Sequence, residues 1–287
     1  DKIPLMDRDL YYRYSIFRKE KVRMFYSGRG CNYTCSYCCV PYMCKIGDAP
    51  HVRKRSPKHL VEEIKETAIK YGMKAAFFQD DTFTQDSIWL EEFINLYKKE
   101  IGKPLMCLSN ACDLNAQKLQ LLKEGGCISI GIGVESINGN TRRILNRNDS
   151  DQQIINAIFY AKKLGMRITT FNIVGLPGET LSDIKNTLEF YRYFPVDSVW
   201  CVLYQEFLSD IRKPIKENKY GNFYMTLREE YDKDINKKFH QYETIQKMMP
   251  YIIKHPKLLK FVGSNILHKI SYLLFAFDSY VREIRVW

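Results

Sequence analysis

The sequence predicts an α/β protein built on a parallel sheet and followed by a helical C-terminal extension. Six short β-branched or apolar runs alternate with segments whose apolar residues recur at helical spacing, an order typical of strands joined by helices. The run at residues 127–134 carries no charge, as expected for a strand covered on both faces. A chain of 287 residues with 45% hydrophobic residues is long enough to bury such a core.

Strands and helices are expected to alternate along the first two thirds of the chain. Between the strands, apolar residues such as Leu60, Ile64 and Ala68 recur every four positions and predict amphipathic helices. The predicted strands are residues 22–27, 74–79, 104–109, 127–134, 167–174 and 197–203.

The alternation stops after Leu203. Residues 225–280 are expected to form helices that break at Pro250 and Pro256, because proline lacks the backbone N–H that a helix interior needs. The chain is thereby divided into an N-terminal linker at residues 1–21, a core at residues 22–204 and a C-terminal extension at residues 205–287.

Composition narrows the class of protein. Five of the nine cysteines lie within residues 31–44, which indicates metal chemistry in a reducing compartment, and we therefore expect a cytoplasmic protein. The N-terminus has no apolar signal-peptide region, and no uncharged run of eighteen residues predicts a membrane span. Because the first residue is Asp1 and not Met, the chain is interpreted as a piece of a longer protein.

The charge of the chain is strongly basic. A net charge of +11 is compatible with binding to nucleic acid or to an anionic membrane surface. Residues 244–287 contribute seven Lys and Arg against two acidic residues, and basic and apolar stretches at residues 257–262 and 270–277 are compatible with peripheral membrane contact. A solvated basic face, with these stretches packed against the core, is the simpler interpretation.

A cysteine loop follows the first predicted strand. Cys31, Cys35 and Cys38 have C-x3-C-x2-C spacing, and three thiolates within eight residues can hold three corners of a 4Fe-4S cube while one iron stays open. A structural zinc site completed by Cys39 or Cys44 is an alternative, as are a four-cysteine electron-transfer cluster and cysteines that simply fill the core.

Polar residues and glycines follow the other predicted strands. Ligands of parallel α/β sheets bind beyond the carboxyl ends of the strands, so we expect these residues to line the same site as the cysteine loop. They are Asp80 and Asp81 after the second strand, Asn110 after the third, Glu135 at the end of the fourth, and Asn172, Gly175 and Gly178 around the fifth.

The cysteine loop resembles the signature of the radical S-adenosylmethionine (radical SAM) superfamily, including Tyr37 directly before the third cysteine. The similarity covers residues 22–203 and implies a partial (β/α)6 TIM-like barrel. Sequence blocks at residues 55–64, 78–83, 131–136 and 173–180 resemble the cobalamin-binding subgroup most closely, and residues 3–7 resemble the linker that follows its cobalamin domain. Residues 30–41 also resemble the tRNA methylthiotransferases.

This resemblance implies a 4Fe-4S cluster on Cys31, Cys35 and Cys38 that cleaves SAM reductively to a 5′-deoxyadenosyl radical. The radical would functionalise a C–H bond by methyl transfer, cyclisation or rearrangement. The residues expected to bind SAM are Tyr37, Asp80, Asp81, Asn110, Glu135, Asn172, Gly175 and Gly178.

The resemblance also implies partners. We expect a small-molecule or lipid substrate, a reductant such as flavodoxin or ferredoxin, and cobalamin only through a missing or separate domain; nucleic acid is not an expected partner. The chain departs from the subgroup at Ala111, where an Arg is frequent, and at residues 201–207, which replace a Pro-Tyr-Pro-Gly-Thr block. A zinc-stabilised nucleic-acid-binding module is the alternative from another class, and a methylthiotransferase-like enzyme is the alternative within the family.

Overall fold

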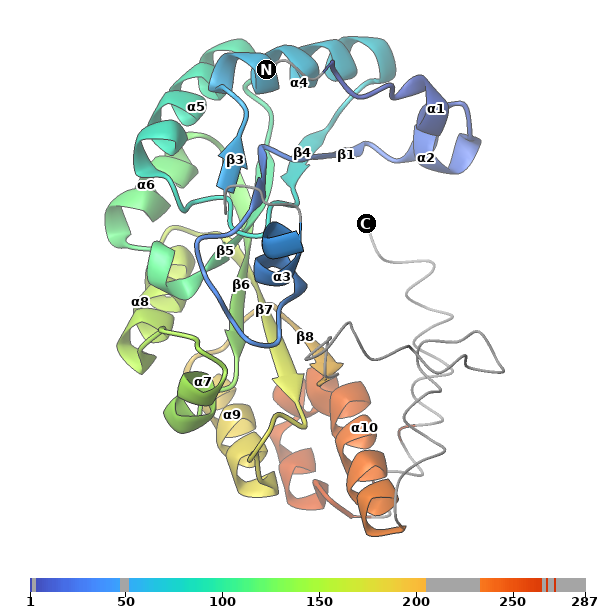
Figure 1. Cartoon of the computed structure of the whole chain (residues 1–287), viewed down its shortest axis with the longest axis vertical. Coiled ribbons are helices and arrows are strands. Elements are labelled where there is room, and N and C mark those ends of the chain that lie inside the picture. Colours follow the sequence, from blue (N-terminus) through green and yellow to red (C-terminus); the bar gives the residue numbers. More distant parts are fainter. Residues whose placement is uncertain (2–3, 47–51, 205–232, 265–266, 268–270, 272–287) are drawn as a thin grey trace. The chain divides into compact units, whose positions relative to one another are not determined.

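The computed structural model describes residues 1, 4–46, 52–204, 233–264, 267 and 271. Six strands form one curled parallel sheet, a half-barrel, which confirms the predicted fold class (Figure 1). Every predicted strand is present with ends shifted by at most two residues. In sheet order the strands are β1 (Val22–Phe25), β4 (Ala75–Phe78), β5 (Leu105–Asn110), β6 (Cys127–Glu135), β7 (Arg167–Val174) and β8 (Ser198–Leu203).

Five helices form where the apolar spacing predicts them. Each follows a Ser, Thr, Asp or Asn whose side chain accepts a hydrogen bond from the backbone N–H three residues on, so each start is fixed by a local cap. They are α4 (Pro57–Tyr71), α5 (Ser87–Glu100), α6 (Ala116–Glu124), α8 (Asp151–Lys163) and α9 (Leu181–Tyr193).

Short elements that the sequence analysis did not predict complete the first two thirds of the chain. Strands β2 and β3 pair antiparallel and carry the chain into and out of the region of the cysteine loop. These elements are α1 (Asp9–Tyr12), α2 (Ser15–Lys19), β2 (Gly28–Gly30), α3 (Cys39–Ile46), β3 (Val52–Lys54), η1 (Ala111–Asp113) and α7 (Gly139–Ile144).

The chain divides into two compact units. Strands β6, β7 and β8 each contribute residues to both of them. Unit 1 comprises Asp1–Val134, Leu145–Phe171 and Val196–Ser198, and unit 2 comprises Glu135–Ile144, Asn172–Pro195 and Val199–Trp287.

The core of unit 1 lies between the sheet and its helices. Helices α4, α5, α6 and α8 lie on the same side of the strands of this unit (Figure 1). On that side Phe78 stacks on Phe83 with ring centroids 4.6 Å apart and meets the edge of Phe93 at 5.2 Å, and all three rings are buried. Burial of such aromatic surface is the main contribution to the stability of this layer.

Unit 2 contains the described part of the C-terminal extension, α10 (Lys233–Lys254) and η2 (Pro256–Phe261). The predicted break at Pro250 is wrong, because α10 continues through it. Met248, Met249 and Ile252 are buried on either side of the proline, so packing of the apolar face outweighs the lost backbone hydrogen bond. Residues 272–287 lie outside the described residues, and no helix among those described is long and apolar enough to cross a bilayer.

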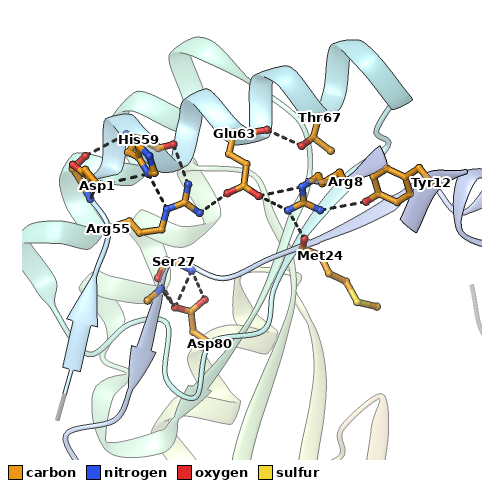
Figure 2. Close-up of polar contacts among 12 residues, drawn as sticks. Asp1, Arg8, Tyr12, Met24, Ser27, Arg55, His59, Glu63, Thr67 and Asp80 are labelled. Carbon is orange, nitrogen blue, oxygen red and sulfur yellow. Dashed lines mark hydrogen bonds and ion pairs between the residues drawn. The ribbon is translucent and has the colours of Figure 1, made fainter. Parts of the chain in front are cut away.

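A buried ionic cluster ties the N-terminal segment to α4 (Figure 2). The guanidinium of Arg8 donates to Glu63 Oε1 through Nε at 3.1 Å and Nη2 at 2.6 Å, and Nη2 also donates to the carbonyl of Met24 at 3.1 Å. Arg55, which follows β3, donates through Nη1 to the other oxygen of Glu63. One carboxylate therefore joins α4 to the N-terminal segment and to the residue after β3, and Arg8 adds a hydrogen bond to β1.

We expect Glu63→Gln to lower the free energy of unfolding by about 3 kcal/mol, because it leaves the buried Arg8 without its counter-charge. The matched control is Glu62→Gln, which changes an exposed carboxylate on the same helix and is expected to cost less than about 0.5 kcal/mol. Urea unfolding followed by circular dichroism measures both. Equal midpoints for the two variants would contradict the role given to the cluster.

Candidate cofactor site

The three predicted cluster cysteines lie on the loop between β2 and α3. Cys31 and Cys35 are buried, Cys38 is half-buried, and all three are free thiols. Burial raises the pKa of each thiol, that of Cys38 to about 12, so a thiolate here needs a nearby positive partner such as a metal centre.

The donor set of this loop, three thiols within eight residues, fits an iron–sulfur cube. No group of three or more His, Cys, Asp or Glu side chains converges to hold one metal ion within the described part of the chain. In a 4Fe-4S cube each protein thiolate binds a different iron, so Cys31, Cys35 and Cys38 do not have to meet at one point.

Asp80 fixes the start of this loop. Its carboxylate is buried and accepts hydrogen bonds from the backbone N–H of Ser27 at 3.0 Å and of Gly28 at 3.0 Å, as well as from the Ser27 hydroxyl (Figure 2). Burial raises the pKa of Asp80 while these bonds oppose the rise. The end of β4 is thus joined to the chain that leaves β1.

Asp81 differs from its neighbour because its side chain is exposed. Burial raises the pKa of Asp81, and a hydrogen bond from the backbone N–H of Gly30 opposes the rise, so the carboxylate lies beside the residue that precedes Cys31. Neither aspartate caps α5, whose N-cap is Asp86. An exposed carboxylate beside the cysteines is available to a cationic ligand.

The loop after β4 also holds the first cysteine. Gln85 Nε2 donates to the carbonyl of Gly30 at 3.4 Å, and Gln85 Oε1 accepts from the backbone N–H of Asn32 at 3.1 Å, so one side chain binds both neighbours of Cys31. Thr82 Oγ1 lies 3.6 Å from the Cys31 sulfur. Sequence reasoning missed Gln85, because a glutamine before a helix cap gives no signal of a distant partner.

A second segment holds the middle of the loop. The carbonyl of Leu145 accepts a hydrogen bond from Ser36 N at 2.9 Å, and Asn146 Nδ2 donates to the Thr34 hydroxyl at 2.7 Å and to its carbonyl at 3.1 Å. Asn146 has a φ of 52°, a left-handed conformation that asparagine tolerates better than most residues. These contacts fix the backbone on both sides of Cys35.

Arg147 brings two predicted SAM residues together. Its guanidinium donates to the Tyr37 hydroxyl at 2.8 Å, to Asn110 Oδ1 at 2.9 Å and to the carbonyl of Gly133 at 2.6 Å, and it forms a buried ion pair with Asp149. Sequence reasoning missed Arg147, because a run of Asn, Arg, Asn and Asp has the composition of a solvated loop. The only sequence feature that could have indicated Arg147 was its position, twelve residues after the strand-end residue Glu135, and this is a weak signal.

Unit 2 contains the other four predicted SAM residues. Glu135 ends β6 with a φ of 61° and is buried, and the amide oxygen of Asn172 accepts a hydrogen bond from the Tyr191 hydroxyl at 2.8 Å. Gly175 and Gly178 have φ values of 80° and 77°, which glycine adopts without strain. The two glycines therefore form a turn directly after β7.

Glu179 organises the turn after β7. Its carboxylate accepts hydrogen bonds from Gly175 N at 2.7 Å and Leu176 N at 3.3 Å, while Tyr242 of α10 donates to the Glu179 carbonyl at 3.2 Å. A Cβ added to Gly175 would lie 3.4 Å from the Tyr242 ring, so the aromatic ring packs directly against this glycine. Burial raises the pKa of Glu179 to about 7.

The half-barrel sheet and the three-cysteine loop define an α/β enzyme of the kind that holds a metal cluster beyond the ends of its strands. Residues 25–191 match the sequence pattern of the Radical SAM superfamily. The chain therefore belongs to the radical SAM superfamily, whose enzymes use a 4Fe-4S cluster and SAM. The resemblance found in the sequence is confirmed, and the match favours the cluster over the zinc-stabilised module.

Known proteins similar to this chain are named as methyltransferases and methylthiotransferases. An uncharacterized methyltransferase of Pyrococcus horikoshii is 28% identical over 173 residues, which is 60% of this chain and 37% of the relative. A ribosomal protein uS12 methylthiotransferase of Clostridium botulinum is 25% identical over 261 residues, 82% of this chain and 55% of the relative. The chain thus spans less than two thirds of the length of either relative.

Solved structures show the same fold. A radical SAM methyltransferase of Kitasatospora setae, solved with cobalamin and a 4Fe-4S cluster bound, has a TM-score of 0.58 and 16% identity. The match covers 71% of this chain and 37% of that one.

We expect Gln85→Leu to weaken retention of the cluster, because the backbone on both sides of Cys31 loses its hydrogen-bond partner. After anaerobic reconstitution, iron loss to a chelator should be about tenfold faster than in the unchanged chain, the effect of two hydrogen bonds of about 0.7 kcal/mol each. Gln152→Leu, at an exposed position of α8, is the control. Iron and acid-labile sulfide per chain report the result, and unchanged retention in Gln85→Leu would contradict it.

Glu179 makes the free energy of unfolding depend on pH. The folded chain keeps the proton of this carboxyl up to about pH 7, whereas the unfolded chain releases it near 4.5. The unfolded state therefore binds fewer protons between these values, and the stability contributed by this group falls as pH rises through that window.

Glu179→Gln, which keeps an acceptor oxygen, is expected to remove this dependence. The difference in thermal midpoint, variant minus unchanged chain, should increase between about pH 4.5 and 7 and stay level above it. Glu189→Gln, at an exposed position of α9, should show no such trend. Parallel midpoint curves for Glu179→Gln and the unchanged chain would argue against the raised pKa.

Proposed function

We propose that this chain cleaves SAM reductively, with Cys31, Cys35 and Cys38 as the cluster ligands. The observation that carries the proposal is the cysteine loop itself. Segments after β4 and after α7 hold this loop by hydrogen bonds to the backbone on both sides of Cys31 and Cys35. A loop fixed at both ends orders three thiols before any cluster binds, which lowers the entropic cost of assembly.

The proposed SAM residues differ in what they offer. When bound, the cluster and SAM supply a 5′-deoxyadenosyl radical that removes hydrogen from a C–H bond. Asp81 offers an exposed carboxylate to the SAM ammonium group. Tyr37 and Asn110, both held by Arg147, offer groups of fixed orientation. The remaining proposed contacts are Asp80, Glu135, Asn172, Gly175 and Gly178.

Methyl transfer is the reaction class that the comparisons favour. The relative from Pyrococcus horikoshii and the solved enzyme from Kitasatospora setae are both named as methyltransferases. We propose a small-molecule substrate, a reductant of the flavodoxin or ferredoxin type, and cobalamin supplied through a further or separate domain. Cyclisation and rearrangement are alternative reactions in this proposal, and a lipid is the alternative substrate. With a lipid substrate, the C-terminal extension would make peripheral contact with a membrane.

Methylthio transfer is the second candidate. The Clostridium botulinum methylthiotransferase matches 82% of this chain, a larger share than the other relatives described above. The two reactions differ in the mass that they add, because a methylthio group carries one sulfur more than a methyl group. High-resolution mass spectrometry of the product therefore distinguishes them.

The proposal predicts 5′-deoxyadenosine when the chain is reconstituted anaerobically and given dithionite and SAM. Cys35→Ala should reduce the product to background, because the cube loses one of three ligands. The control is Cys39→Ala, an exposed cysteine at the start of α3, which should retain both the cluster and the product. Persistence of the product in Cys35→Ala would overturn the proposal, and loss of the cluster in Cys39→Ala would show a fourth ligand.

A further inference from the structure

One face of the sheet in unit 1 is apolar and lies opposite the face on which α4, α5, α6 and α8 pack (Figure 1). Met24 of β1, Phe77 of β4 and Met106 of β5 are neighbours in the parallel register, so their side chains share a face. Met24 is 41% exposed, and the other two are half-buried. The opposite face carries the buried residues that pack against α4 and α5.

Contacts near the ionic cluster show which way the Met24 side chain points. Its carbonyl accepts from Arg8, while its side chain points away from α4 (Figure 2). Arg23, the charged residue of β1, lies on the helix side and donates to the carbonyls of Tyr71 and Gly72 at 2.9 Å. Strands β4 and β5 contain no charged residue. The apolar face therefore receives no charge from these three strands.

The apolar face continues toward the carboxyl ends of the strands. Leu108 is paired in register with Gly131, and a Cβ on Gly131 would lie 2.6 Å from Leu108 Cδ2 and 2.7 Å from Phe171 Cε2. Because Gly131 has no side chain, Leu108 and the Phe171 ring can both pack over this position. An apolar patch of Leu108 and Phe171 results near the carboxyl ends of β5 and β7.

A neutral polar pair follows Met24 and Phe77 on this face, and the neutral Ser129 is the register neighbour of Met106. The hydroxyl of Tyr26, which is 49% exposed, donates to Gln79 Oε1 at 3.3 Å. A hydroxyl and an amide can each donate and accept, but neither can balance a charge. The pair can hydrogen-bond a neutral substituent without a counter-charge, whereas a charged substituent would gain no opposite charge from it.

The apolar face is continuous with the cofactor loop. Tyr26 directly precedes Ser27, which Asp80 anchors, and Asn110, two residues after Leu108, is bound by the same Arg147 that holds Tyr37. A group resting on this face therefore lies along the strands that lead to the proposed SAM residues.

We propose that the face formed by Met24, Phe77, Met106, Leu108 and Phe171 binds a neutral, flat apolar or aromatic group of the substrate, with a hydrogen-bonding substituent at Tyr26 and Gln79. This inference rests on the proposed function. It adds the substrate class: the reacting molecule presents an uncharged ring-like portion to the sheet. Thioether and aromatic side chains favour such a partner through sulfur–ring and ring–ring contacts.

The test uses the full chain, reconstituted anaerobically and labelled with carbon-13 at the methionine methyl groups. Phenol, benzoate and benzylammonium, three single-ring probes of similar size, are titrated separately. Phenol should shift the methyl resonances of Met24 and Met106, while those of the buried Met73 and Met166 stay in place. Benzoate and benzylammonium should shift the Met24 and Met106 resonances only at about tenfold higher concentration or more, because a charge beside these methionines would lose its water without gaining a counter-ion. An ammonium group held by the exposed Asp81 would leave both resonances in place.

Variants distinguish binding at this face from nonspecific binding of phenol elsewhere on the protein. Phe77→Ala should raise the dissociation constant of phenol several-fold and Tyr26→Phe should reduce the preference for phenol over benzene. Phe159→Ala, at a ring 56% exposed on α8, should change neither. Equal shifts of the Met24 and Met106 resonances by the charged probes, or shifts spread over all methionines, would overturn the inference.

Formation of 5′-deoxyadenosine without substrate tests the proposed function separately. If that product forms while phenol binds nowhere on this face, only the substrate class is wrong. If phenol binds as expected and no 5′-deoxyadenosine forms, only the cofactor chemistry is wrong.

Discussion

The rest of the site depends on the buried carboxylate of Asp80. It accepts from two consecutive backbone N–H groups and a hydroxyl where the chain leaves β1, so two parallel strands end at the same level. A carboxylate withdrawn from water needs such partners, and the partners in turn need the carboxylate. The cysteine loop begins three residues beyond Gly28. Its position is therefore set by the end of β4 and not by the loop residues alone.

Strands and helices were predictable because their signals are local. Short β-branched or apolar runs predicted the six strands, and apolar residues at helical spacing predicted α4 to α9 apart from the short α7. The cysteine spacing also pointed to its chemistry directly. Pro250 misled because the prediction weighed one missing backbone hydrogen bond and had no information on the packing of α10.

Parts of the site could not be predicted from the sequence because they depend on contacts between segments far apart in the chain. Gln85 binds residues more than fifty positions away, and Arg147 joins Asn110, 37 positions away, to Tyr37, 110 positions away. Asp80 was singled out as a ligand, whereas the structure shows its carboxylate engaged with the backbone; a SAM contact by this residue stays a prediction. Sequence identified the chemistry-bearing residue types, and the structure added the residues that orient them.

Leu145, Asn146 and Arg147 each hold a different part of the cysteine loop, and they are consecutive. Removing or inserting one residue here would rotate all three away from their partners at once. The connection is therefore restricted in length as well as in composition, unlike most surface connections, which accept insertions freely. Diversification of this scaffold toward new substrates has to proceed by exchanging side chains on the sheet or by growth elsewhere.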